Sequence, residues 1–472
     1  MTVQDESFMV IMKFGGTSVK DATAMHRVAA IVRRAEQRGV RPLVVVSAMS
    51  KVTDQLIRAA MRAAQGEEDD AASLVQQLAA RHREAAESVA GSRHLPDLTT
   101  ALESDWRDAT ELLHALAILR DLAPRSLDAL VATGEIASSR LMTAALRAAG
   151  LAPVWVDARR VLVTDEEHGT AQPDMAATRE RVRLEVEPHI SAGGVPVVGG
   201  FIGATKQGAT STLGRGGSDY SASIFGAVLG AAEIQIWTDV DGMLTADPRV
   251  VSGTRSVRSL SFAEASELAY FGAKVLHPST ILPAVGAGIP VRILNSHRPD
   301  VPGTTIVESP PISPTPITAL ACKRDVTVID ITSSRMFMAH GFLRRLFEVF
   351  ERYRTSVDVV TTSEVSVSVT VDDTRHLAAI LSALEEFADV SAEREMALLC
   401  AVGERLRTDA ALSAQILGAL EGFPLRMVSQ AGSRRNVTVV LPEAQLAAAM
   451  GLIHDRFCAL RQEAAPTSME LA

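Results

Sequence analysis

Short apolar runs alternate with long stretches of helical periodicity in the N-terminal part of this chain. The runs are rich in β-branched and aromatic residues and lie at residues 8–14, 43–47, 195–202, 234–238 and 291–295. Strands separated by helices are typical of an α/β domain with a largely parallel sheet. Residues 55–122 are rich in alanine and charge, which predicts a group of helices that covers the sheet or caps a substrate cleft.

A proline-rich segment then interrupts regular structure. Residues 308–316 contain four prolines, and we predict a linker there. Residues 8–307, before the linker, are predicted to form the α/β domain. After it, the order strand, helix, strand, strand, helix occurs twice, which predicts two small α+β units at residues 317–395 and 396–465. One irregular α+β domain is the alternative.

The composition limits the class of protein. With 472 residues, of which 47% are hydrophobic, the chain can fill two or three cores. A formal net charge of −9 leaves no broad basic surface, so nucleic acid and membranes are not expected partners. The widely spaced Cys322, Cys400 and Cys458 predict reduced thiols. Without a basic leader or a long apolar span, we expect a cytoplasmic protein.

A glycine turn follows the first predicted strand. Lys13-Phe-Gly-Gly-Thr-Ser18 joins this strand to a helix predicted at residues 22–38. Backbone N–H groups at such a junction can bind phosphate, and the glycines permit close approach. Lys13 can add positive charge to a transferring phosphoryl group, and Thr17 or Ser18 can cap the helix. The lysine precedes the glycines, so this is not a Walker A loop, and the turn alone is more often only a tight turn.

A second glycine turn precedes a helix predicted at residues 220–231. Its sequence is Thr212-Leu-Gly-Arg-Gly-Gly-Ser-Asp219. Arg215 can hold a carboxylate with two hydrogen bonds, while Asp219 can pair with an ammonium group or help to place a metal ion. A solvated loop is the alternative for one such turn. Two of them in one α/β domain predict a site that transfers a group between two substrates.

Three further motifs carry charge. Thr133-Gly-Glu135 is predicted to open a helix, where the carboxylate either binds an amino group or only caps the helix. Residues 237–249 resemble the start of an EF-hand, but Val250 stands where the closing glutamate belongs, so we predict a nucleotide-binding loop instead. Lys274 is either a second cation near the phosphates or a surface lysine.

The sequence contains no Ser-His-Asp arrangement, metal-binding histidine pair or protein-kinase catalytic loop. A carboxylate nucleophile is already ionised at neutral pH and needs no general base. It needs alignment, and it needs lysines, N–H groups and magnesium to neutralise the phosphoryl charge. The two glycine turns with their charged side chains match that requirement.

Together these motifs closely resemble those of the aspartate kinases. They are KFGGTS at 13–18, TGE at 133–135, GRGGSD at 214–219, WTDVDG at 237–242 and FGAKVLHP at 271–278. The resemblance covers nearly the whole chain and implies an amino-acid-kinase α/β/α sandwich followed by two ferredoxin-like ACT units, as in the monofunctional, lysine-sensitive members. Residues 317–322 are then expected to complete the second ACT unit. The length leaves no room for a homoserine dehydrogenase portion.

The resemblance also implies the reaction and its residues. The γ-phosphoryl group of ATP is transferred to L-aspartate, with magnesium bound mainly by the ATP phosphates. Catalytic roles fall to Lys13, Asp219 and Lys274. The implied ATP contacts are Lys13, Gly15, Gly16, Thr17, Thr238, Asp239, Leu244, Asp247, Arg249, Lys274 and Val275. The implied aspartate contacts are Ser47, Thr53, Glu135, Phe201, Arg215, Gly216, Gly217, Ser218 and Asp219. Relatives often carry a tyrosine at Leu244, whose loss would change ATP affinity rather than the reaction.

A lysine effector site is implied in the tail. It comprises Met336, Ala339, Gly341, Phe342, Leu343, Val357, Asp358, Thr362, Ser363 and Glu364. A helix start at Gly341 offers N–H groups to the effector carboxylate, and Asp358 with Glu364 can bind its ammonium groups. Ala339 replaces a serine that is common in relatives. The resemblance implies self-association through the ACT units as a dimer or tetramer, and ACT units that only dimerise are the alternative.

Two other functions are alternatives. An amino-acid kinase acting on a different carboxylate or on a carbamate, such as acetylglutamate kinase, is disfavoured by the ACT tail and by Glu135. A catalytically silent amino-acid sensor is disfavoured because the sequence retains all four of Lys13, Glu135, Arg215 and Asp219.

Overall fold

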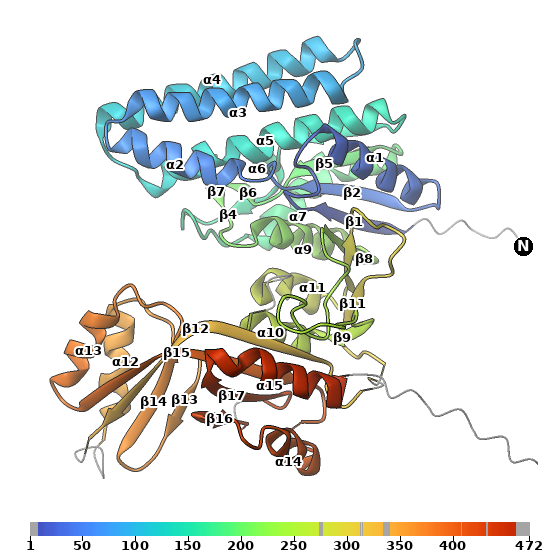
Figure 1. Cartoon of the computed structure of the whole chain (residues 1–472). Helices are drawn as coiled ribbons and strands as arrows, with labels where there is room; N and C mark the ends of the chain where they lie inside the picture. Colours follow the sequence, from blue (N-terminus) through green and yellow to red (C-terminus); the bar gives the residue numbers. More distant parts are fainter. Residues whose placement is uncertain are drawn as a thin grey trace, which may run out of the picture. The chain divides into compact units, whose positions relative to one another are not determined.

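The computed structural model describes residues 8–272, 277–311, 313, 315–333, 340–406, 408–430 and 433–458. The chain divides into two compact units (Figure 1). Unit 1 consists of Met1–Met243 and Leu276–Ser309, and unit 2 consists of Leu244–Val275 and Pro310–Ala472. The grouping of Leu244–Val275 with the C-terminal part of the chain is a feature that the sequence did not suggest.

Unit 1 is built around a mainly parallel sheet with the strand order β3-β5-β2-β1-β8-β10-β11. Its strands are β1 (Met9–Phe14), β2 (Arg41–Val46), β3 (Pro153–Val156), β5 (Val195–Gly199), β8 (Glu233–Thr238), β10 (Val291–Asn295) and β11 (Thr304–Val307). The central strand β1 pairs in parallel with β2 and β8, so the loops that follow these three strands leave the same edge of the sheet.

The run predicted at residues 195–202 is interrupted, because Phe201 adopts a positive φ of 68° that turns the chain. The chain then enters a small second sheet of β4 (Val163–Thr164), β6 (Ile202–Thr205) and β7 (Thr210–Thr212). The turn directs β7 toward the second glycine motif.

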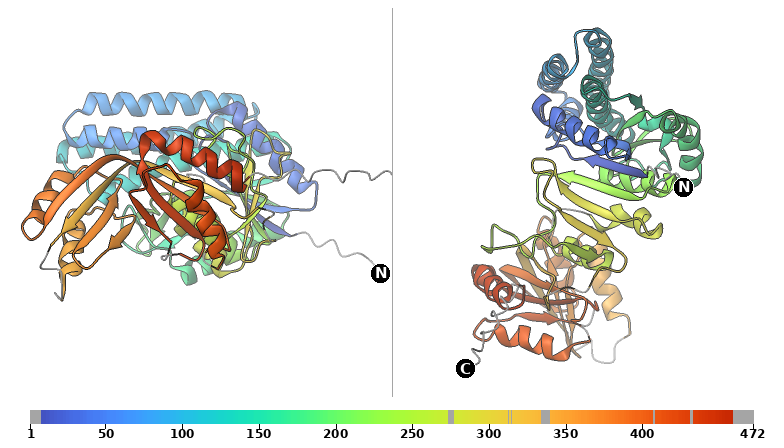
Figure 2. Two further views of the ribbon diagram at one scale, coloured as in Figure 1. Left: turned by 60° about the horizontal axis from the view of Figure 1, so that its bottom comes forward. Right: turned by 90° about the vertical axis from the view of Figure 1, so that its right-hand side faces the viewer.

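Unit 1 also contains helices. They are α1 (Ala22–Glu36), α2 (Val52–Ala64), α3 (Glu68–Val89), α4 (Leu95–Leu119), α5 (Pro124–Ala148), α6 (Ala158–Val161), α7 (Met175–Glu185), α8 (Glu187–Ser191), α9 (Gly217–Leu229), the 3₁₀ helix η1 (Pro278–Ile281) and α11 (Leu282–Gly286). The helix group predicted at residues 55–122 is confirmed as α2, α3 and α4 (Figures 1 and 2).

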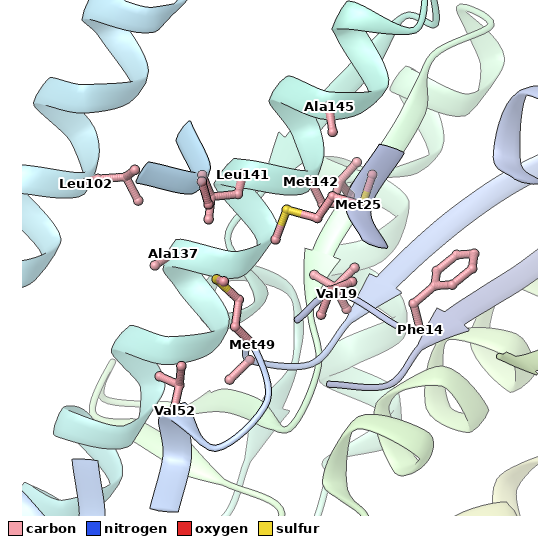
Figure 3. Close-up of a cluster of buried hydrophobic side chains, with 14 of the residues drawn as sticks. Phe14, Val19, Met25, Met49, Val52, Leu102, Ala137, Leu141, Met142 and Ala145 are labelled. Atoms are coloured by element: carbon pink, nitrogen blue, oxygen red, sulfur yellow. The ribbon is translucent and has the colours of Figure 1, made fainter. Parts of the chain in front are cut away.

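The long helix α5 is the centre of the main core of unit 1. Its side chains Ala137, Leu141 and Met142 gather with Met25 of α1 and with Met49 (Figure 3). Most of α5 is buried, including its polar residues, because other helices and the sheet surround it. A polar side chain on this helix is therefore held rigidly and is shielded from water.

Unit 2 contains a six-stranded sheet with the order β13-β14-β12-β15-β17-β16. The elements of the unit are β9 (Ser259–Ser261), α10 (Phe262–Tyr270), β12 (Ala319–Thr332), α12 (Phe342–Arg352), β13 (Val360–Thr362), β14 (Ser366–Val371), α13 (Leu377–Glu385), β15 (Asp389–Val402), α14 (Ala410–Ala419), β16 (Met427–Ser429), β17 (Asn436–Pro442), the 3₁₀ helix η3 (Glu443–Gln445), α15 (Leu446–Ile453) and the π-helical turn η4 (His454–Cys458).

Two long antiparallel strands, β12 and β15, connect the halves of this sheet. The start of β12 pairs with the end of β15, from Ala319 opposite Val402 to Lys323 opposite Leu398, and the end of β12 pairs with the start of β15. One core lies against α12 and α13, and a second against α14 and α15. The predicted fold class, an α/β domain followed by two α+β units, is confirmed. No helix within the described ranges is both long and apolar enough to cross a bilayer.

Candidate active site

A pocket of about 710 Å³ in unit 1 brings the two glycine turns together. All nine residues predicted to contact aspartate line it, together with Lys13, Gly15, Gly16, Thr17, Thr238 and Asp239. The parallel strands β1, β2 and β8 deliver three of the lining loops to one edge of the sheet, which is the usual position of a ligand site in such folds.

The first turn is fixed by backbone hydrogen bonds. The N–H of Gly15 donates to the carbonyl of Trp237 (3.1 Å), and that of Ser18 donates to the carbonyl of Gly15 (2.9 Å). A Cβ on Gly16 would lie 2.9 Å from the carbonyl oxygen of Ala48, so only glycine fits there. The prediction that Thr17 or Ser18 caps α1 is wrong: Asp21 is the cap, accepting from the N–H of Ala24.

An ion pair joins the two turns. Nζ of Lys13, near the end of β1, lies 2.5 Å from Oδ1 of Asp219 in the first turn of α9. Both side chains are largely buried, at 10% and 14% exposed. Burial strengthens the attraction between the charges, and both residues of the pair line the pocket.

The second turn leads directly into α9. Gly214 and Gly216 have φ values of 78° and 71°, a conformation that side chains with a Cβ disfavour. Helix α9 begins at Gly217, three residues before the predicted start, so Ser218 and Asp219 lie in its first turn, where N–H groups have no partner within the helix. Arg215 is exposed and lines the pocket.

Glu135 lies inside α5, which corrects the prediction that the TGE motif opens a helix. A capping role is thereby excluded. The side chain is buried, and Oε1 accepts from the N–H of Ala48 at 3.3 Å. Its Oε2 is buried without a hydrogen-bond partner in the described part of the chain. Burial raises the pKa of Glu135 to about 8. A cation placed in the pocket would therefore be needed to favour the ionised carboxylate at neutral pH.

Residues that were not predicted from the sequence also contribute to the pocket, among them Lys51 and Asp128. Lys51, with a left-handed φ of 68°, adds a cation from the loop after β2. Asp128 lies seven residues before Glu135 on the same helix and accepts from Oγ1 (2.5 Å) and N–H (3.2 Å) of Thr212. It also accepts from the N–H of Gly169 (3.0 Å) and pairs with Nδ1 of His168 (2.9 Å). Asp128 thus braces the base of the second turn, and the seven-residue spacing to Glu135 was the available signal.

The residues predicted to surround the nucleotide are divided between the units. Thr238 and Asp239 line the pocket of unit 1. Leu244, Asp247 and Arg249 belong to unit 2, where Leu244 pairs in a β-bridge with Ser256. Hydrogen bonds from Arg249 hold the pKa of Asp247 below its usual value. Lys274 and Val275 lie outside the described residues.

The residues predicted to bind an effector belong to unit 2. Gly341 has a φ of 86° and precedes α12, whose first residues are Phe342 and Leu343. Val357 and Asp358 precede β13, in which Thr362 is the last residue, and Ser363 and Glu364 follow in the turn before β14. The side chain of Asp358 is buried, and Glu364 is exposed. Met336 and Ala339 lie outside the described residues.

Family comparisons match both parts of the chain. Residues 8–295 match the amino acid kinase family, and residues 399–457 match an ACT domain. Among curated proteins, the chain is 37% identical over 449 residues to lysine-sensitive aspartokinase 3 of Escherichia coli, covering 92% of this chain and 96% of that protein. It is 35% identical over 473 residues to the chloroplastic aspartokinase 3 of Arabidopsis thaliana, covering 96% and 82%.

The chain is also similar to solved structures of aspartokinases. Aspartokinase III of E. coli in complex with lysine and aspartate has a TM-score of 0.82 and 34% sequence identity, covering 96% of this chain and all of that one. The same enzyme in complex with aspartate and ADP has a TM-score of 0.80 and 35% identity, covering 95% and 99%.

Proposed function

The chain belongs to the aspartokinases of the amino acid kinase family, and from this premise we propose that it transfers the γ-phosphoryl group of ATP to the β-carboxylate of L-aspartate, giving ADP and 4-phospho-L-aspartate. The main support within the molecule is the single pocket that holds both glycine turns, the Lys13–Asp219 pair and Glu135. An amino acid can be bound there at its amino group and at its carboxylates while it faces a phosphate cradle.

Each end of aspartate has a matching group in the pocket. The ammonium group of aspartate would meet Oε2 of Glu135, which is buried and lacks a hydrogen-bond partner in the part of the chain described. The exposed guanidinium group of Arg215 suits a carboxylate. Lys13 would place positive charge on the phosphoryl oxygens as the β-carboxylate attacks, with Gly15 and Gly16 allowing the phosphate to approach the backbone. The carboxylate attacks in its ionised form, so no proton has to be removed.

Magnesium fits this pocket as a partner of the nucleotide. Among the described residues, no group of three or more His, Cys, Asp or Glu could hold a metal ion. Asp239 and Asp219 are carboxylates on the pocket, and Asp219 is already paired with Lys13. We therefore propose that the ATP phosphates supply most of the magnesium ligands and that the ion, when bound, neutralises phosphate charge.

The direct test is ATP- and magnesium-dependent formation of an acyl phosphate from L-aspartate, trapped as the hydroxamate. N-Acetyl-L-aspartate is a matched control, because it keeps both carboxylates but lacks the ammonium group that Glu135 would bind. With ATP and magnesium present, we expect turnover of L-aspartate and no turnover of the acetylated compound. Equal turnover with the acetylated compound, or ADP release that does not depend on aspartate, would reject the assignment.

We further propose that lysine inhibits the enzyme through unit 2, at the residues around Asp358. The support is the likeness to E. coli aspartokinase III in complex with lysine, together with the buried carboxylate near the start of β13. Asp358→Ala is expected to abolish lysine inhibition. Inhibition at the same lysine concentration in this variant would remove Asp358 from the effector site.

Self-association and a cytoplasmic location are also proposed. Val360 on β13 and Val428 on β16, at the two edges of the sheet of unit 2, are 39% and 40% exposed, and edge strands of this kind can pair with a second copy. Light scattering of the purified chain should give a mass of two or four subunits. A monomer at micromolar concentration would contradict the assembly.

A further inference from the structure

A largely buried ion pair in unit 2 involves the carboxylate that we assign to the effector. Nζ of Lys323 lies 2.7 Å from Oδ1 of Asp358 and 3.0 Å from Oδ2 of Asp372. The side chain of Asp358 is 3% exposed and that of Lys323 is 18% exposed. The chain thus supplies its own ammonium group to Asp358.

Lys323 is held in place from several directions. It lies on β12 where the register with β15 shifts, between Lys323 and Val326. The ring of Tyr270, at the end of α10, lies 5.1 Å from its Nζ. Two residues after Tyr270, a Cβ on Gly272 would clash with the carbonyl oxygen of Cys322, the residue before Lys323. The backbone next to Lys323 is therefore in close contact with the residues that follow α10, and the ammonium group has little freedom to leave without a replacement.

Asp358 retains capacity for a second cation. Its Oδ2 is buried, and the hydroxyl of Tyr270 is the group near enough to bond with this carboxylate. Burial, and then the charge of Asp358, raise the pKa of Tyr270. A buried carboxylate can accept several hydrogen bonds from ammonium donors. An effector ammonium at Asp358 would therefore stand beside the ammonium of Lys323.

We propose that Lys323 is a built-in competitor for the cationic group of the effector, so that it raises the lysine concentration needed to occupy Asp358. The inference rests on the effector function proposed above. Two like charges at one buried carboxylate repel each other. When the effector binds, it must either displace the ammonium group of Lys323 toward Asp372 and away from Tyr270, or bind beside that group against the repulsion. Either way, the dissociation constant of the effector is raised.

The experiment is calorimetric titration of L-lysine into the full-length chain. Lys323→Met keeps the length of the side chain and removes its charge, and Lys323→Arg keeps the charge. Arg324→Met, at the neighbouring position, is a matched control. Arg324 is about half exposed, and its ion pair with Glu443 is long, at 4.0 Å. We expect the dissociation constant of lysine to fall about tenfold in Lys323→Met and to change less than about twofold in the other two variants.

A second variant protects the test against misfolding. If Lys323→Met does not fold, Lys323→Gln keeps a hydrogen-bond donor without the charge, and it is expected to tighten lysine binding in the same direction. Lysine binding that is unchanged or weaker in the folded neutral variant would overturn the competitor role and leave the effector site intact.

The failure of the underlying proposal has a different signature. If the unsubstituted chain phosphorylates aspartate but neither binds lysine nor is inhibited by it, the effector site and the competitor role are both overturned. If lysine binds, and binds more tightly in Lys323→Met, while aspartate is not phosphorylated, the competitor role is supported and the kinase assignment alone is overturned.

Discussion

The pocket of unit 1 and the sheet of unit 2 each bury a lysine–aspartate pair, but they differ in what lies beside it. Lys13 and Asp219 in the pocket are 2.5 Å apart, and Lys323 and Asp358 in the sheet are 2.7 Å apart. Beside the pair in the pocket lies a second buried carboxylate, Glu135. Among the described residues, no cation lowers the pKa of Glu135. The ionised form of Glu135 is therefore favoured at neutral pH only when a cationic ligand is bound.

This difference separates two ways of recognising an ammonium group. In the pocket, the ligand supplies the cation that Glu135 lacks, so binding relieves the cost of a buried carboxylate. In unit 2, the ligand has to share Asp358 with a lysine of the chain. A substrate site of the first kind favours affinity, and an effector site of the second kind favours a response only at high effector concentration.

The largest effect is expected from the Lys13–Asp219 pair, because its ammonium group acts on the transferring phosphoryl group. Lys13→Met should lower kcat by about a thousandfold and change KM for aspartate much less. Initial rates of hydroxamate formation measure both constants. The control is Lys206→Met, which removes an exposed lysine that pairs with Asp174 at 2.9 Å. A defect confined to KM for aspartate would show that Lys13 acts in substrate binding and not on the transferring phosphoryl group.

The next largest effect concerns Glu135, whose Oε2 is buried in the pocket without a hydrogen-bond partner among the described residues. Glu135→Gln keeps the volume and the bond from the N–H of Ala48 but removes the charge, so KM for aspartate should rise about a hundredfold with a smaller change in kcat. Glu233→Gln, at a carboxylate that already has Arg292 at 3.5 Å, is the matched control. Equal KM values in the unsubstituted chain and Glu135→Gln would remove Glu135 from the ammonium site.

The sequence allowed much of the fold to be predicted, because its signals are local. The alternation of strands and helices placed β1, β2, β8 and β10, and the alanine-rich composition of residues 55–122 placed α2, α3 and α4. The interior position of Glu135 on α5 escaped prediction, because α5 buries polar residues such as Ser138 and Thr143 along with its apolar ones and so lacks the one-sided apolar pattern that marks a helix. The grouping of Leu244–Val275 with unit 2 depends on contacts between distant segments, which leave no local signal.

The candidate site was predictable in its motifs but not in its pairings. Both glycine turns are read directly from the sequence, and the structure lines one pocket with both. The partner of each charge was not predictable. Asp219 pairs with Lys13, and Asp358 pairs with Lys323, although the sequence placed a ligand beside each of these carboxylates. Such pairings depend on distances of a few ångströms between separate elements.

The contrast between the two carboxylates also predicts a pH dependence. In the free protein Glu135 is mostly protonated below its pKa of about 8, whereas the ordinary pKa of a glutamate side chain is 4.5. Aspartate requires the ionised form, so binding releases a proton at lower pH, and KM for aspartate should fall up to about tenfold per pH unit as pH rises toward about 8. The trend should level off above that pH and be absent in Glu135→Gln. A flat KM profile in the unsubstituted chain would show that Glu135 is already ionised.

The same raised pKa has a consequence for stability. The folded carboxyl group retains its proton between pH of about 4.5 and about 8, while the unfolded one has lost it, so the folded state binds more protons in this window. The free protein should therefore lose stability as pH rises through the window, and bound aspartate should reduce that loss. Thermal unfolding at several pH values, with and without aspartate, measures the loss of stability and its reduction by aspartate. Glu135→Gln should lack the loss that is due to Glu135.

The smallest effect is expected from Asp128, which supports the pocket without lining it. Asp128→Asn replaces one acceptor oxygen by a donor, so its bonds to Thr212 and Gly169 cannot all be kept, and the second glycine turn should lose its firm position. KM for aspartate should rise about threefold with little change in kcat. Asp157→Asn is the control, since Asp157 caps α6 in the same unit and pairs with Arg159 at 2.6 Å. Loss of thermal stability in both variants, with a change in KM only in Asp128→Asn, would identify Asp128 as a positioning residue. Equal KM values in the two variants would reduce it to a structural one, and the pocket would then owe the placement of Arg215 to the glycine turn alone.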